Sequence, residues 1–146
     1  GRLDGVENDM GVVCDNGIVG KVANTSNHYC MVISMLHPYS IVSARLKDNQ
    51  HLVNVRWDNG NYRFGVVEDI PAHLVLNQGD TVVTSGYSSV FPPDVAIGTI
   101  EEMFVSKKKD FNTAKIRFST NFSTLRHVYI AKNIYKSELD SLAMTQ

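Results

Sequence analysis

Residues 51–68 read HLVNVRWDNGNYRFGVVE, and this stretch has the clearest secondary-structure signal in the chain. Apolar and aromatic residues recur at every second position on both sides of its centre: Val53, Val55 and Trp57 before it, and Tyr62, Phe64 and Val66 after it. The centre, Asp58-Asn59-Gly60, consists of residues that accept the positive φ of a tight turn. A period of two around such a turn predicts a β-hairpin with one aromatic-rich face.

The same alternation of strand and turn precedes this hairpin. Residues 11–14 form an apolar run that ends at the turn Asp15-Asn16-Gly17, and residues 18–22 resume the strand. Residues 29–36 (YCMVISML) are rich in large and β-branched apolar side chains, which predicts a buried strand. Residues 41–46 favour a further strand.

Short strands also follow the hairpin, after an interruption at Ile70-Pro71. They are expected at residues 81–85, 95–100, 103–105, 115–118 and 127–131, and a short helix at most is expected in the tail at 136–146. Many short strands with frequent turns predict an all-β sandwich or barrel. The break at residues 70–80 suggests two small β-barrels, at residues 1–73 and 74–146, and the last strand could return to the first barrel.

The composition narrows the classes of function. The chain has 146 residues, of which 43% are hydrophobic, so it can bury a core. The net charge is −1, whereas binding to phosphates needs a basic excess, and we therefore expect no nucleic-acid partner. No apolar run reaches the roughly 20 residues that span a bilayer. The start at Gly1, without an initiator methionine, is typical of a fragment of a longer protein.

A serine hydrolase is the first catalytic alternative, because chymotrypsin-type enzymes use a double β-barrel. The chain offers His28 or His37, then Asp58 or Asp69, then Ser85, in the order of that class. The local sequence Thr84-Ser85-Gly86 lacks the Gly-Asp-Ser-Gly type of loop that supplies oxyanion-hole amides. We therefore expect that Ser85 ends a strand, that Gly86 permits a turn, and that the chain has no catalytic residues.

Other chemical sites have little support in the sequence. The five histidines are scattered, so we expect no metal site, and without a phosphate-binding glycine loop we expect no cofactor. The lysines at 107–109 could touch an acidic membrane surface, but we expect a solvated loop tip. Cys14 and Cys30 fit either two separate thiols or one disulfide.

Two aromatic residues stand in the Gly/Pro/Ser-rich loop at residues 86–93. Tyr87 and Phe91 could be partner-binding anchors, or they could fill the end of a barrel. The residues leave both alternatives open.

Four motifs in order resemble the MreC family of rod shape-determining proteins over about residues 5–131. They are GVV at 11–13, NGIVGKV at 16–22, GDTVVTSG at 79–86 followed by Phe91-Pro92, and IGTI at 97–100. The family often has glycine where this chain has Asp94, and aspartate tolerates the left-handed conformation better than most residues. We interpret the motif residues as fold-forming: Gly17, Gly20, Gly79, Asp80, Ser85, Gly86, Pro92 and Gly98.

The resemblance implies an extracytoplasmic scaffold. It implies two six-stranded β-barrels with a trypsin-like topology but without catalytic residues. A transmembrane helix and a coiled coil would precede Gly1 and anchor the domain at the periplasmic face of the inner membrane. Expected partners are the elongation-specific penicillin-binding transpeptidase, MreD, the MreB system and further copies of the chain, as an oligomer or filament. The alternatives are a serine hydrolase and an extracellular glycan- or peptide-binding module.

Overall fold

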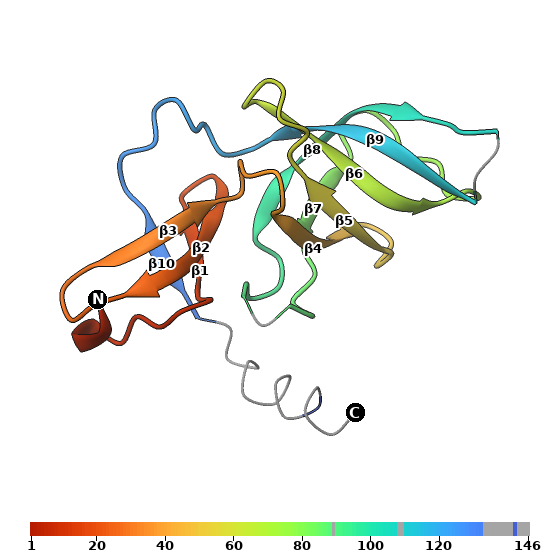
Figure 1. Cartoon of the computed structure of the whole chain (residues 1–146). Helices are drawn as coiled ribbons and strands as arrows, with labels where there is room; N and C mark the ends of the chain where they lie inside the picture. Colours follow the sequence, from red (N-terminus) through yellow and green to blue (C-terminus); the bar gives the residue numbers. More distant parts are fainter. Residues whose placement is uncertain (89, 108–109, 133–141, 143–146) are drawn as a thin grey trace.

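The computed structural model describes residues 1–88, 90–107, 110–132 and 142, and its regular structure is almost entirely β (Figure 1). A 3-10 turn, η1 (Arg2–Asp4), comes first. The strands are β1 (Gly11–Cys14), β2 (Gly17–Thr25), β3 (Cys30–Ser34), β4 (Ile41–Leu46), β5 (Leu52–Arg56), β6 (Phe64–Pro71), β7 (Thr81–Thr84), β8 (Ala96–Phe104), β9 (Phe111–Phe118) and β10 (Tyr129–Ala131). The predicted all-β class is confirmed. Apart from Leu142, the expected C-terminal tail lies outside the described residues.

The strands form two sheets that pack against each other. One is a four-stranded sheet in the order β10-β1-β2-β3, and the other is a closed six-stranded barrel in the order β4-β5-β6-β9-β8-β7. The predicted six-stranded barrel is thus confirmed for one of the two units. In the part of the chain that the structure describes, the other unit has four strands, because β4, β5 and β6 complete the barrel instead. Ala44 of β4 pairs with Thr84 of β7, and Gly65 of β6 pairs with Ile116 of β9.

The predicted division between residues 73 and 74 does not coincide with the boundary between the sheets. It falls between β6 and β7, and both strands belong to the barrel. The chain crosses from one sheet to the other between β3 and β4, and it crosses back before β10. There Val12 of β1 pairs with Ile130.

A shared core joins the two sheets. The barrel interior is filled by alternate side chains of its strands, such as Val55, Val67 and Ile116, each with no exposed surface. Ile18 of β2 and Met35, after β3, belong to this same cluster although they lie outside the barrel strands. A smaller cluster lies under the four-stranded sheet and consists of Met10, Val12, Val19 and Val22. The burial of Ile18 in the barrel core fixes the two sheets against each other.

The hairpin at residues 51–68 forms, but its second strand has the opposite phase to the one predicted. Gly65 and Val67 face the barrel interior, whereas Phe64 lies on the outer surface. A Cβ at Gly65 would overlap the ring of Phe118, which fills this part of the core. The Nζ of Lys115 lies 4.1 Å from the centroid of the Phe64 ring and covers it from solvent.

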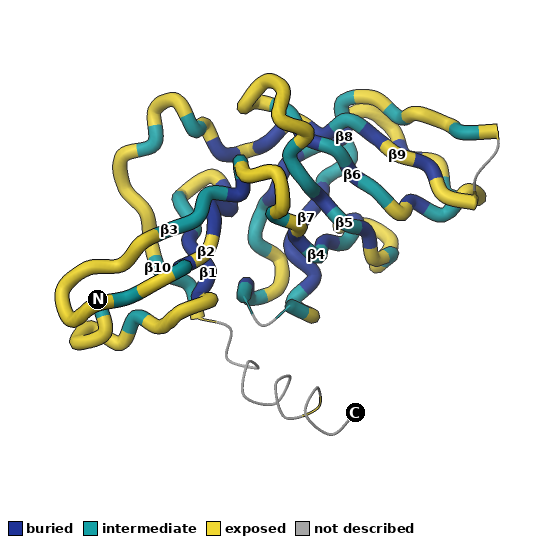
Figure 2. The backbone as a smooth tube through the Cα atoms, viewed as in Figure 1, coloured by how far each residue is buried: buried dark blue, intermediate teal, exposed yellow. Residues whose placement is uncertain are grey.

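The strand predicted at residues 29–36 exists as β3, but it is not buried. Tyr29 is 79% exposed and Met31 is 65% exposed (Figure 2 shows this end of the sheet largely as exposed). The reason is that β3 is an edge strand and the sheet covers a core on one face only. An apolar run therefore did not signal burial here.

Candidate functional site

A groove of about 330 Å³ opens where the barrel meets the four-stranded sheet. Its walls come from β2, β3, the connection to β4, β4 itself and the loop that follows β7. Most of the lining is apolar: Ile33, Met35, Tyr39, Ile41, Val90 and Phe91. A groove with this lining is better suited to binding an apolar segment of a partner than to binding a charged ligand.

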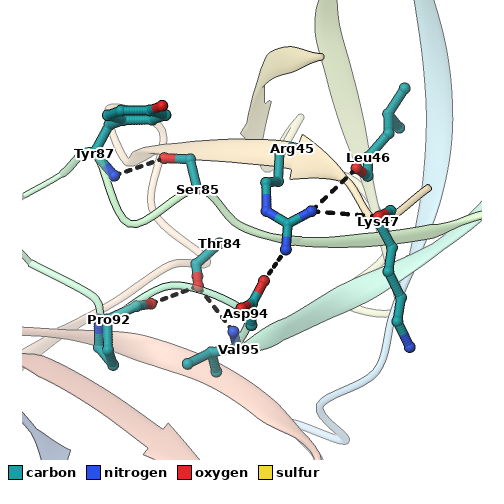
Figure 3. A network of polar contacts seen from close by, with 9 residues as sticks. All are labelled: Arg45, Leu46, Lys47, Thr84, Ser85, Tyr87, Pro92, Asp94 and Val95. Atoms are coloured by element: carbon teal, nitrogen blue, oxygen red, sulfur yellow. Dashed lines mark hydrogen bonds and ion pairs between the residues drawn. The ribbon is translucent and has the colours of Figure 1, made fainter. Parts of the chain in front are cut away.

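The loop after β7 forms one wall of the groove, and hydrogen bonds from Thr84 hold its far end (Figure 3). The Oγ1 of Thr84 donates to the carbonyl oxygen of Pro92 over 2.7 Å and accepts from the N–H of Val95 over 2.9 Å. Thr84 is 1% exposed, so these bonds satisfy a buried hydroxyl. One side chain therefore closes the loop at residues 85–95.

An ion pair outside the barrel wall supports the same loop. The guanidinium of Arg45, on β4, pairs with the carboxylate of Asp94, and it also donates to the carbonyl oxygen of Lys47 over 3.3 Å (Figure 3). Asp94 has a φ of 69°, in the left-handed region that glycine favours. Its carboxylate thus holds the turn to β4 at a position where the backbone alone would prefer glycine.

Phe91 connects the loop to the four-stranded sheet. Its side chain is 5% exposed and belongs to the barrel core, so the ring is not available to a partner in this structure. The carbonyl oxygen of the neighbouring Val90 accepts a hydrogen bond from the N–H of Gly11 over 3.1 Å. A Cβ at Gly11 would lie 2.6 Å from the Phe91 ring, which explains why glycine is needed there.

Tyr87, unlike Phe91, is exposed: its relative exposure is 69%. Its N–H donates to the Oγ of Ser85 over 3.2 Å, which fixes the backbone while the ring stays accessible (Figure 3). It remains a candidate partner contact.

The rim of the groove carries exposed apolar side chains that the sequence did not single out. Tyr39 is 88% exposed and Ile41 is 64% exposed. The Nδ1 of His37 accepts from the N–H of Tyr39 over 3.2 Å, which orders this short connection. Tyr39 stands in the polar context His37-Pro38-Tyr39-Ser40, and an aromatic residue in such a loop was the available signal.

The residues of the catalytic alternative do not come together. The Oγ of Ser85 lies 2.9 Å from the Oγ of Ser43, and among the described residues it has no histidine partner. The carboxylate of Asp69 accepts from the side chain of Asn54 over 2.7 Å, and that of Asp58 accepts from the N–H of Gly60. These contacts account for the three side chains as parts of turns and strands.

The histidines and cysteines are the side chains on which a metal site or a disulfide would depend. His51 and His73 lie with ring centroids 5.9 Å apart, but no group of three or more metal-ligating side chains occurs within residues 1–88, 90–107 and 110–132. Cys14 and Cys30 are separate thiols in this structure. No helix in the described part of the chain is long and apolar enough to cross a membrane.

The fold-forming residues lie at turns and at close backbone contacts. Gly79 and Gly86 have φ values of 92° and 79°. The Asp80 carboxylate accepts from the N–H of Asn77 over 2.8 Å and closes the turn before β7. Two further glycines stand at close backbone contacts between strands. A Cβ at Gly20 would overlap the carbonyl oxygen of Ile33, and one at Gly98 would overlap that of Arg117.

Gly17 packs against the backbone of Ala96 and so brings the β1–β2 turn onto the barrel. The carbonyl oxygen of Pro92 accepts the hydrogen bond from Thr84 described above.

Comparisons with known proteins agree with this geometry. The family model described as "Rod shape-determining protein MreC, barrel core" matches residues 1–132. The cell shape-determining protein MreC of Listeria monocytogenes is 28% identical over 135 residues, which cover 90% of this chain and 46% of that protein. The chain thus spans about half the length of this relative.

Two solved structures have the same fold. MreC from Listeria monocytogenes superposes with a TM-score of 0.82 at 28% identity, covering 91% of this chain and 65% of that one. A complex between penicillin-binding protein 2 and MreC from Helicobacter pylori contains a chain that superposes with a TM-score of 0.70 at 22% identity, covering 88% of this chain and 82% of that one.

Proposed function

This chain belongs to the MreC family of rod shape-determining proteins, and we propose that it is a non-catalytic scaffold that binds the elongation-specific penicillin-binding transpeptidase. In this proposal the scaffold organises peptidoglycan synthesis at the extracytoplasmic face of the membrane. It activates the transpeptidase by binding one of its conformations better than the others, which shifts the population toward that state.

The observation that carries this proposal is the Helicobacter pylori complex, in which a protein of this fold is paired with penicillin-binding protein 2. The groove supports the proposal, because burial of the exposed apolar side chains at its rim against a partner would contribute favourable free energy of binding. Tyr39 and Ile41 are the contacts we propose first, with Tyr87 as a further one. MreD, the MreB system and further copies of the chain are additional proposed partners.

The proposal includes the absence of catalysis. Its support is the position of Ser85, which is 8% exposed and hydrogen-bonded to Ser43 rather than to a histidine. Replacement of Ser85 by alanine should therefore weaken partner binding little, and only through Tyr87, whose N–H loses its acceptor. Covalent labelling of Ser85 by an active-serine reagent would contradict the proposal and favour the hydrolase alternative.

The decisive experiment is calorimetric titration of residues 1–146 with the extracytoplasmic part of the transpeptidase from the same genome. We expect saturable binding at micromolar affinity or tighter, which corresponds to about −8 kcal/mol at 1 μM. The double variant Tyr39→Ser/Ile41→Ser should bind at least tenfold more weakly and keep its melting temperature, because both side chains are exposed.

Tyr129→Ser is the matched control, since Tyr129 is 54% exposed on β10, at the opposite edge of the four-stranded sheet. It should bind like the unaltered chain. Failure of two folded proteins to bind would contradict the scaffold proposal. Normal binding by the double variant would contradict the groove as the contact surface, and binding to free glycan strands instead would favour the glycan-binding alternative.

A further inference from the structure

The β8–β9 hairpin extends from the end of the barrel that lies away from the four-stranded sheet (Figure 1). Its stem carries large apolar side chains in solvent: Phe104 is 48% exposed, Val105 is 72% exposed and Phe111 is 53% exposed. Val75, in the loop after β6, is 74% exposed. Figure 2 shows this end of the molecule largely as exposed.

Hydrogen bonds order the backbone that carries these side chains. Asn112 is 2% exposed, and its Oδ1 accepts from the N–H of Ser106 over 3.0 Å, which closes the turn between β8 and β9. The N–H of Ala72 donates to the carbonyl oxygen of Asp110 over 2.9 Å, so the loop with Val75 is attached to the same turn. The exposed apolar groups are therefore part of an ordered surface.

Basic residues are concentrated at positions 107–109 of the sequence, and the structure describes the first of them. Lys107 is exposed two residues after Val105, and the sequence continues with two more lysines, which lie outside the described residues. Asp110 and Glu102 are the acidic residues of the hairpin nearest to this run in sequence. The chain as a whole has a net charge of −1, so a run of three lysines differs from its overall charge balance.

We propose that this end of the barrel, formed by Phe104, Val105, Lys107 and Phe111 of the hairpin and by Val75 of the loop after β6, binds an anionic lipid surface. Lysine attracts acidic headgroups, and aromatic and aliphatic side chains insert at the boundary between headgroups and acyl chains. A soluble polyanion would need only Lys107 and would leave the apolar groups in water. The combination of apolar groups with lysine at a protruding end therefore favours a bilayer.

Vesicle co-sedimentation of residues 1–146 tests the proposal. The chain should bind vesicles of phosphatidylcholine with phosphatidylglycerol, bind little to phosphatidylcholine alone, and bind less as salt increases. Lys107→Gln should weaken partitioning about fivefold, the effect of one charge near the surface. Val105→Asp should weaken it more, because it removes an apolar contact and adds a negative charge.

Matched controls lie beside the strands of the four-stranded sheet, next to β10 and β3. Lys132→Gln and Tyr29→Asp change an exposed lysine and an exposed apolar side chain there, and both should bind vesicles normally. Absence of binding, or equal binding by the Lys107→Gln and Val105→Asp variants, would overturn the proposal. Binding to soluble polyglutamate that Lys107→Gln weakens and a Val105→Ser variant does not would also overturn it, because that result identifies a polyanion site.

Discussion

At the residue scale, Gly20 decides how closely β2 and β3 approach each other. A Cβ at Gly20 would overlap the Ile33 carbonyl oxygen across the β2–β3 pair. We therefore predict that Gly20→Ala lowers the free energy of unfolding by about 1–3 kcal/mol, measured by urea denaturation. Gly60→Ala is the control, because a Cβ there would meet only the flexible side chain of Asp58. An equal effect of both substitutions would contradict the overlap as the cause.

Asp94 offers a second test at the same scale, because its side chain stabilises the folded state while its left-handed backbone conformation destabilises it. Asp94→Ala loses the ion pair with Arg45 and keeps the left-handed φ of 69°. Asp94→Gly loses the same ion pair but relieves the backbone. We predict that the glycine variant is more stable than the alanine variant by about 1 kcal/mol. Thermal melts of the two proteins check this, and equal melting temperatures would contradict it.

At the scale of the element, the loop at residues 85–95 connects the two sheets through one aromatic ring. Phe91→Ala should lower the free energy of unfolding by about 3–5 kcal/mol, because the ring is 5% exposed in the shared core. Tyr87→Ala, in the same loop, should change stability by less than about 0.5 kcal/mol, because its ring is in solvent and its loop contact is made by the backbone. Denaturation of both variants shows which of the two rings contributes to the core, and a minor loss for Phe91→Ala would contradict the core assignment.

At the scale of the whole molecule, the shared core predicts one cooperative unfolding transition. Ile18 comes from the four-stranded sheet and is fully buried in the barrel cluster, against which Trp57 of the barrel also packs. Ile18→Ala should therefore shift the unfolding midpoint seen by Trp57 fluorescence, with a loss of about 2–5 kcal/mol. Two separate transitions, or a tryptophan signal that does not respond, would show that the sheets unfold independently.

The strands and several turns were predictable because their signals are local. A turn forms where Asp15-Asn16-Gly17 predicted one, with Asp15 and Asn16 between the paired positions Cys14 and Gly17. Gly86 has the positive φ that its place after a strand suggested. Such positions depend on the φ and ψ preferences of single residues, which the sequence states directly. The order of these motifs also indicated the family.

The candidate site was less accessible to sequence reasoning. Of the two aromatic residues proposed for partner contact, Tyr87 is exposed and Phe91 is in the core, although both stand in the same loop. Tyr39 and Ile41, at the rim of the groove, were not singled out. Exposure depends on which segments pack nearby, and these segments are distant in sequence.

The sequence by itself determined the all-β class, the family and most strand positions, because periodicity and turn chemistry act over a few residues. The tertiary structure alone decided that β4, β5 and β6 close the barrel and that the apolar strand β3 is an exposed edge. It also decided the inward phase of β6, where Gly65 makes room for Phe118. Pairing and burial join residues that are far apart in the chain, so no local pattern contains them.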